Sequence, residues 1–297
     1  MKQIELKALA KINLGLDVLG KRENGYHDVR MIMQSIYLYD DVTIQRKDTQ
    51  GIEVETNLHF LPTDKNNIAY KAAKLLMEEF HLPGGVRILL NKRIPVAAGM
   101  AGGSSNAAAV LFGMNKMFRL GLSQEELMER GVQLGADVPY CIMRGTVLAE
   151  GIGEELTVLP SMPPCVVLIA KPPISVSTRV VYEALDSKEI VTHPDIDGLI
   201  DGLEKGSLQE IAKYMGNVLE DVTIPLHPVI ENIKREMKQA GALNAMMSGS
   251  GPTVFGLFEN RKAARKAQER IRRKGLAKQV YITNVHNARR TEDGTKI

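Results

Sequence analysis

A predicted strand and a predicted helix are joined by Pro95-Val96-Ala97-Ala98-Gly99-Met100-Ala101-Gly102-Gly103-Ser104-Ser105-Asn106. Before this segment, residues 86–90 place an apolar side chain at every second position, which is typical of a strand. After it, residues 107–118 place apolar side chains every three or four positions, as on one face of a helix. We therefore expect a helix that begins near Gly103, directly behind a loop of small residues.

This loop, Pro95 to Ser105, has the composition of a phosphate-binding loop. Small residues let backbone N–H groups approach an anion closely, and the following helix adds its unpaired N-terminal amides. Ser104 or Ser105 could offer a hydroxyl to a phosphate or to Mg²⁺. The lysine of a P-loop and the glycine spacing of a dinucleotide fold are both missing. A tight loop that only caps a helix remains the alternative when this segment is taken alone.

Lys11 and Asn13 lie on a predicted strand. Apolar residues occupy the even positions from Ile4 to Val18, so the side chains of Lys11 and Asn13 share the opposite face. Phosphoryl transfer to a hydroxyl needs a cation that stabilises developing charge, and Lys11 could supply it. A solvated lysine on the exposed face of a strand is the alternative interpretation.

Asp137 is a lone acid that follows Gly135-Ala136 and precedes Val138-Pro139. Because Pro139 disfavours a helical conformation at Val138, we expect Asp137 in a turn with its side chain free to reach a cleft. A carboxylate placed in this way could accept the proton of an attacking hydroxyl. A structural acid at a helix end is the alternative.

The chain divides in two by its patterns. The first part is mostly strand, with a turn at Asn24-Gly25, a helix near residues 68–80 and a capping box that opens a helix at Ser123. Prolines crowd residues 159–164, which we interpret as a linker between domains 1–159 and 160–297. The second part reads as α+β. Its basic helix, residues 261–274, is interpreted as a solvated face, with a polyanion site as the alternative.

Composition excludes several classes of protein. Lys and Arg number 38 against 35 Asp and Glu, a balance of +3 that is too mild to indicate nucleic acid or an anionic membrane as partner. The two cysteines, Cys141 and Cys165, cannot build a disulfide framework, and no run of 18 to 20 apolar residues is present. We therefore expect a cytoplasmic protein that binds no nucleic acid and no membrane.

The run Pro95 to Ala107, together with Gly249-Ser250-Gly251-Pro252-Thr253, resembles two motifs of the GHMP kinases. Four further segments are similar to one branch of these kinases: Ala10 to Leu14, Gly25 to His27, Gly135 to Pro139 and Ala149 to Gly153. The resemblance implies a two-domain α+β fold with the active site in the interdomain cleft. It also implies ATP and Mg²⁺ as cofactors. The substrate it implies is a small molecule linked to cytidine diphosphate, phosphorylated on the 2-hydroxyl of its methylerythritol part for isoprenoid precursor synthesis.

The same resemblance implies roles for individual residues. Asp137 matches the proton acceptor, Lys11 the catalytic lysine and Asn13 a substrate contact, while Pro95 to Ser105 would bind ATP. His27 would read the edge of the cytosine, and Tyr26 or Tyr182 would stack on its ring. No metal-ligating residue is assigned, and we expect a monomer or a weak homodimer.

Two alternatives remain open at this stage. Another GHMP kinase, of the homoserine or mevalonate type, would have no use for base recognition by Tyr26 and His27. A non-catalytic protein on the same scaffold would have no use for Lys11 and Asp137 beside a phosphate loop.

Overall fold

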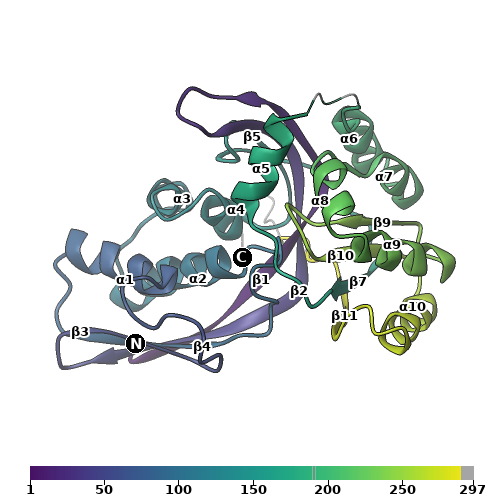
Figure 1. Cartoon of the computed structure of the whole chain (residues 1–297). Helices are drawn as coiled ribbons and strands as arrows, with labels where there is room; N and C mark the ends of the chain where they lie inside the picture. Colours follow the sequence, from purple (N-terminus) through teal and green to yellow (C-terminus); the bar gives the residue numbers. More distant parts are fainter. Residues whose placement is uncertain (189, 191, 289–297) are drawn as a thin grey trace. The chain divides into compact units, whose positions relative to one another are not determined.

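The computed structural model describes residues 1–188, 190 and 192–288 (Figure 1). These residues form two compact units, each made of three chain segments. Unit 1 comprises Met1–Ala10, Leu38–Val96 and Ala101–Met143, and unit 2 comprises Lys11–Tyr37, Ala97–Met100 and the chain from Arg144 onward. The units do not coincide with the expected domains 1–159 and 160–297, because the two longest strands each contribute to both units. The boundary at residue 159 stays a prediction.

Unit 1 contains a sheet with the strand order β3-β4-β2-β1. The strands are β1 (Gln3–Lys21), β2 (His27–Lys47), β3 (Gly51–Thr56) and β4 (Gly85–Asn91). β3 pairs with β4 in parallel, and β4 pairs antiparallel with β2 in a register that sets Asp41 opposite Asn91. β2 is continuous over the 21 residues from His27 to Lys47, so it contributes to both units.

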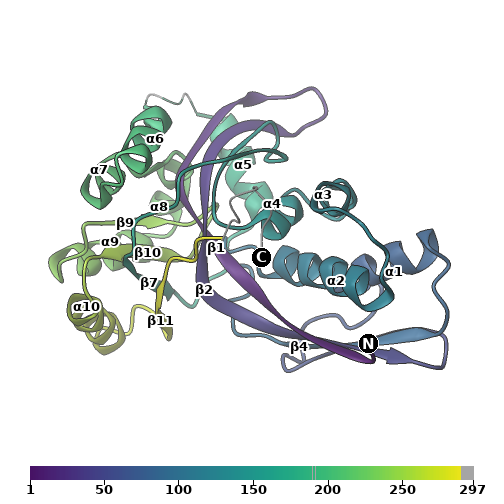
Figure 2. The same ribbon diagram turned by 180° about the vertical axis from the view of Figure 1, so that it is seen from behind.

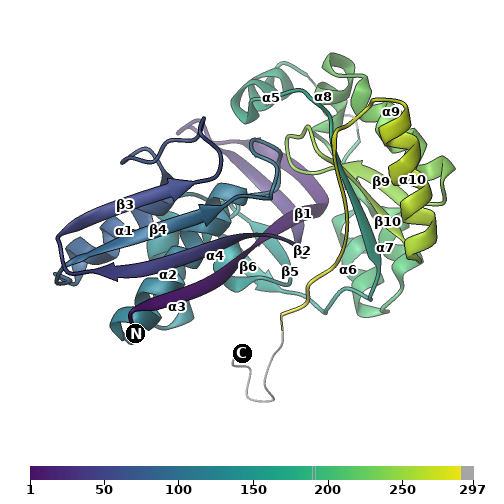
Figure 3. The same ribbon diagram turned by 90° about the horizontal axis from the view of Figure 1, so that it is seen from below.

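Four helices accompany this sheet: α1 (Ile68–Glu79), α2 (Gly102–Phe118), α3 (Gln124–Val132) and α4 (Asp137–Met143). α2 packs against the other three, and Figure 3 shows α1 and α2 along the same strands. A β-carbon at Gly113 would lie 2.5 Å from Ile44 and 2.8 Å from Leu6, so α2 approaches the sheet closely there. The capping box predicted at Ser123 and Glu126 is confirmed at the start of α3.

Unit 2 contains a four-stranded antiparallel sheet in the order β11-β7-β10-β9. The strands are β7 (Val166–Lys171), β9 (Asn244–Met247), β10 (Val254–Phe258) and β11 (Gln279–Asn284). Helices α9 (Val229–Gln239) and α10 (Arg261–Arg273) pack on this sheet, as Figure 2 shows. β10 is buried along its whole length, so this sheet and the two helices enclose one part of the core of the unit.

The rest of unit 2 is built around the C-terminal half of β1 and the N-terminal half of β2. β2 pairs with β5 (Thr146–Glu150), β5 with β6 (Glu155–Val158), and β1 with the short β8 (Gly216–Asn217). The helices are α5 (Thr178–Asp186), α6 (Ile196–Glu204), α7 (Leu208–Tyr214) and α8 (Glu220–Leu226). Across the described part of the chain, none of the helices combines the length and apolar character that crossing a bilayer requires.

Candidate active site

The small-residue loop has an unusual backbone. Ala97, Gly99 and Ala101 have φ values of 49°, 69° and 54°, so alternate residues occupy the left-handed region. Alanine adopts this conformation at a cost of roughly 1–2 kcal/mol, and such strain gathers where a site needs a fixed backbone. The surrounding structure therefore holds the loop in a backbone conformation that is unfavourable for its alanines.

A glycine turn of unit 2 contacts the middle of this loop. A β-carbon at Gly99 would lie 2.0 Å from the carbonyl oxygen of Ser248, and the hydroxyl of Ser248 donates to the carbonyl of Gly99 at 2.9 Å. The turn is itself held by Asn217, whose Nδ2 donates to the carbonyls of Met247 and Gly249, both at 2.9 Å. Gly249 and its neighbours thus contact and shape the loop.

Lys11 and Asn13 lie against the same loop. The backbone N–H of Lys11 donates to the carbonyl of Met100 at 3.2 Å, which joins β1 to the loop within unit 2. Lys11 Nζ donates to Asn13 Oδ1 at 2.7 Å, and Asn13 Nδ2 lies 3.3 Å from the sulfur of Met31. The structure therefore brings Lys11, Asn13, Gly99 and Gly249 together within unit 2.

Within the described residues, the ammonium group of Lys11 is buried without a carboxylate partner. Lys11 is 5% exposed and Asn13 is fully buried, although sequence analysis allowed a solvated Lys11. The side chain that Lys11 contacts is the neutral amide of Asn13. A buried charge is costly unless an opposite charge compensates it, so this position is suited to an anionic ligand.

In unit 1, the N-terminus of α2 has no side-chain cap among the residues that the structure describes. Its N-cap is Ala101, among the poorest capping residues, so first-turn amides of this 17-residue helix remain for another acceptor. Gly103 is exposed, whereas Ser105 is 3% exposed and donates its hydroxyl to the carbonyl of Leu9 at 2.6 Å. An uncapped helix N-terminus behind a small-residue loop is a favourable position for phosphate.

Asp137 also belongs to unit 1, where it is the first residue of α4 and is half-buried. The expected turn with an extended Val138 is wrong, because Val138 and Pro139 both lie in this helix. Proline is tolerated in a first turn, where its missing N–H would have had no helical partner. The carboxylate of Asp137 is thus presented at a helix N-terminus rather than from a loop.

His27 lies in a cluster that the sequence only partly predicted. Gly25 has φ of 85° in the predicted turn, and Tyr26 beside it is 58% exposed. His27 Nε2 is 2.6 Å from Asp186 Oδ1, and its ring centroid is 4.7 Å from that of Tyr182. An ionised carboxylate can only accept a hydrogen bond, so His27 Nε2 carries the proton and donates the hydrogen bond to Asp186 Oδ1.

Asp186 is a site residue that sequence analysis missed. Its other oxygen accepts from Lys21 Nζ at 2.6 Å, and these two hydrogen bonds, from Lys21 and then from His27, lower the pKa of the carboxyl group. Asp186 stands 159 residues from His27 along the chain, so only folding reveals the pair.

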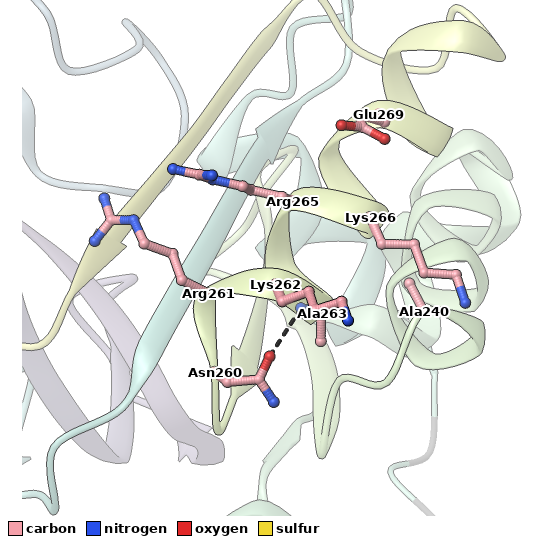
Figure 4. Close-up of a pocket in the computed structure, with 8 residues that line it drawn as sticks. All are labelled: Ala240, Asn260, Arg261, Lys262, Ala263, Arg265, Lys266 and Glu269. Atoms are coloured by element: carbon pink, nitrogen blue, oxygen red, sulfur yellow. Dashed lines mark hydrogen bonds between the residues drawn. The ribbon is translucent and has the colours of Figure 1, made fainter.

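Two other observations concern possible metal ligands and a pocket away from the predicted site residues. Among the described residues, no three His, Cys, Asp or Glu side chains cluster closely enough to hold a metal ion. A pocket beside the start of α10 is lined by Ala240, Asn260, Arg261, Lys262, Ala263, Arg265, Lys266 and Glu269 (Figure 4). None of the sequence-predicted site residues lines this pocket.

Two family models match the chain. The model described as "GHMP kinases N terminal domain" matches residues 67–145, and "GHMP kinases C terminal" matches residues 199–277. The first range contains the loop and Asp137, and the second contains the glycine turn. Each model also lies within one of the two domains expected from the sequence.

Curated relatives and solved structures agree with these matches. The 4-diphosphocytidyl-2-C-methyl-D-erythritol kinase of Lachnospira eligens is 58% identical over 95% of this chain and 98% of its own length. A crystal structure of 4-(cytidine 5'-diphospho)-2C-methyl-D-erythritol kinase superposes with a TM-score of 0.82 at 32% identity, covering 96% of this chain and all of that one. The homoserine kinase of Cytophaga hutchinsonii has a TM-score of 0.76 over 96% of this chain and 95% of its own. At 21% identity, that match supports the fold alone.

Proposed function

The chain belongs to the GHMP kinases, and we propose that it transfers the γ-phosphoryl group of ATP to the 2-hydroxyl of 4-diphosphocytidyl-2-C-methyl-D-erythritol. The hydroxyl oxygen forms a bond to the γ-phosphorus while the bond from that phosphorus to the β,γ-bridging oxygen breaks, so ADP leaves. No phosphorylated form of the enzyme is needed for this direct transfer.

The loop Pro95 to Ser105 holds the phosphates of ATP in this proposal. Its left-handed residues, the close approach at Gly99 and the uncapped start of α2 support the assignment. These amides need no reorganisation as charge moves between phosphate oxygens, which is the property that lowers a barrier electrostatically.

Asp137 accepts the proton of the 2-hydroxyl, and Lys11 stabilises the negative charge that develops during transfer. The burial of Lys11 beside a neutral amide supports its role, because an approaching phosphate supplies the missing opposite charge. Asn13 orients the ammonium group through the hydrogen bond at 2.7 Å.

His27 recognises the cytosine, with Tyr26 or Tyr182 stacked on the ring. The bond between His27 Nε2 and Asp186 leaves Nδ1 of a neutral imidazole as an acceptor. The exocyclic amino group of cytosine is a donor, so this tautomer suits cytosine better than uracil. Stacking on an aromatic side chain contributes roughly 1–3 kcal/mol per base.

Mg²⁺ fits the donor set of the loop together with the phosphates of ATP. Mg²⁺ retains several waters and is usually held by one or two protein oxygens together with substrate phosphates. The hydroxyl of Ser104 is the loop oxygen that would hold it here, because Ser105 is buried and donates its hydroxyl to the carbonyl of Leu9, and Asp137 is assigned to the proton transfer. When bound, the ion neutralises charge on the triphosphate.

The buried ammonium group of Lys11 is the observation that carries the proposal. A comparison of phosphoryl acceptors tests the proposed activity. ADP release is measured with 4-diphosphocytidyl-2-C-methyl-D-erythritol, homoserine and mevalonate as separate acceptors. We expect turnover with the first only. Turnover with homoserine or mevalonate instead would support another GHMP kinase, and no turnover with any of them would overturn the assignment.

Asp137→Asn tests the mechanism separately. We expect turnover to fall by roughly 10²–10⁴, the usual effect of losing a general base, with nucleotide affinity nearly unchanged. Asp64→Asn is a matched control, since Asp64 is exposed and bonds the nearby Asn66. A near-normal rate for Asp137→Asn would remove this residue from the proton transfer.

A further inference from the structure

A buried cluster in unit 1 lies where the small-residue loop leaves the sheet and enters α2. It consists of Asp40 on β2, Lys92 just after β4, and Asn106 in α2. Asp40 is fully buried, Lys92 is 8% exposed and Asn106 is 2% exposed. None of the three has a role in the phosphoryl transfer proposed above.

Asp40 fixes the end of β4, where the loop begins. Its Oδ1 accepts the backbone N–H groups of Arg93 and Ile94 at 2.6 and 2.8 Å. The register that sets Asp41 opposite Asn91 brings Asp40 and Lys92 together one residue further on, where Lys92 Nζ donates to Asp40 Oδ2. One carboxylate thus holds three consecutive residues, 92–94, directly before Pro95.

The same cluster holds the first turns of α2, where the loop ends. Lys92 Nζ donates to Asn106 Oδ1 at 2.6 Å and lies 3.4 Å from the carbonyl oxygen of Gly102. Asn106 Nδ2 returns a hydrogen bond to Asp40 Oδ2 at 2.9 Å. The two ends of the loop are therefore joined through a closed, charge-balanced set of side-chain contacts.

We propose that Asp40, Lys92 and Asn106 are positioning residues that fix both ends of the phosphate loop before ATP binds. A loop with two left-handed alanines would relax if its ends were free, and its amides would then have to be reordered by the ligand. Binding to a pre-organised site avoids that ordering cost, so the cluster acts on ATP affinity through the loop. The inference rests on the proposed role of the loop in ATP binding.

The test uses two variants that cut the link to α2. Asn106→Ala removes the helix side and leaves the ion pair intact. The double variant Asp40→Asn, Lys92→Met removes the charges together, which avoids an unpaired buried charge, while the amide oxygen that replaces the carboxylate can still accept from the backbone of the strand end. The dissociation constant of ATP is measured by calorimetry on folded protein, together with KM for each substrate and the urea midpoint.

We expect ATP to bind about ten- to a hundredfold more weakly in both variants, with KM for the phosphoryl acceptor changed by less than about threefold. Asp41→Asn is the matched control, because Asp41 is adjacent, is partly exposed and bonds the side chains of Arg93 and Asn91 at that end of the strand. It should bind ATP as the wild type does. Unchanged ATP affinity in folded variants, or equal rises in both KM values, would overturn the proposal, whereas a wild type that fails to bind ATP would overturn the proposed function instead.

Discussion

Two lysines are buried in the described part of this chain, and their surroundings differ. Lys92 in unit 1 is paired with the carboxylate of Asp40 and with Asn106, so its charge is balanced within the fold. Lys11 in unit 2 is as deeply buried but donates to the neutral amide of Asn13. The first arrangement holds backbone in place, and the second leaves Lys11 without a carboxylate partner among the described residues, which suits the anion-binding role proposed above. Burial alone would not separate the two roles, whereas the charge of the partner does.

The largest effect is expected on stability, from Lys92→Met. Removing one partner of a buried ion pair leaves the other charge uncompensated, which typically costs about 3–5 kcal/mol. The free energy of unfolding, measured in urea without nucleotide, should fall by that amount. An unchanged free energy of unfolding would mean that the charge of Asp40 is compensated without Lys92. The Lys92–Asp40 pair would then not be the charge-balanced pair described above.

Lys11→Met is expected to act on the rate. Losing a group that stabilises charge in the transition state lowers kcat by roughly 10²–10³, about 2.7–4 kcal/mol. Steady-state turnover at saturating ATP and acceptor measures it. If kcat fell by less than about threefold, the unbalanced lysine would not be part of the reaction.

Asn13→Asp is expected to give Lys11 a carboxylate partner, as Lys92 already has in Asp40. The new carboxylate would balance Lys11 and compete with the phosphate, so kcat should fall by about tenfold while stability is kept. Asn13→Ala separates the effects of charge and orientation, because it removes the contact and adds no charge. A wild-type rate in Asn13→Asp would argue against the importance of an unbalanced charge at Lys11.

Asp186→Asn is expected to have the smallest effect. Asp186 is partly exposed, bonds His27 and Lys21, and would act only on the orientation of His27. KM for the acceptor should rise by a few-fold with KM for ATP unchanged. Lys21→Met is the control, since it removes the other partner of Asp186 and leaves His27 in contact with it. An equal change in KM for the acceptor in both variants would mean that the cluster acts only as a surface ion pair.

Local signals in the sequence predicted much of the fold. Asn24-Gly25 formed the expected turn, and Ser123 and Glu126 formed the expected capping box. These features depend on neighbours within four residues, which a sequence displays directly. Helices α6 and α8 were not predicted: α6 contains two glycines and α8 contains Pro225, so their intrinsic helix propensity is low and tertiary packing decides them.

The partners of the site residues were harder to predict. Lys11, Asn13, His27 and Tyr182 were named from the sequence, and the structure places the first two beside the loop and the last two beside each other. Asp40 and Lys92 are 52 residues apart, and each stands beside a second residue of like charge, so both resembled solvated surface groups. Their burial follows from strand register, which no local pattern specifies.

The free energy of unfolding of Lys11→Met, measured in urea beside Lys92→Met and without nucleotide, tests the contrast between the two lysines most directly. The unbalanced charge of Lys11 is a cost to the unliganded fold, so the variant should be as stable as the wild type or more stable. A loss of about 3–5 kcal/mol, equal to that expected for Lys92→Met, would contradict the account.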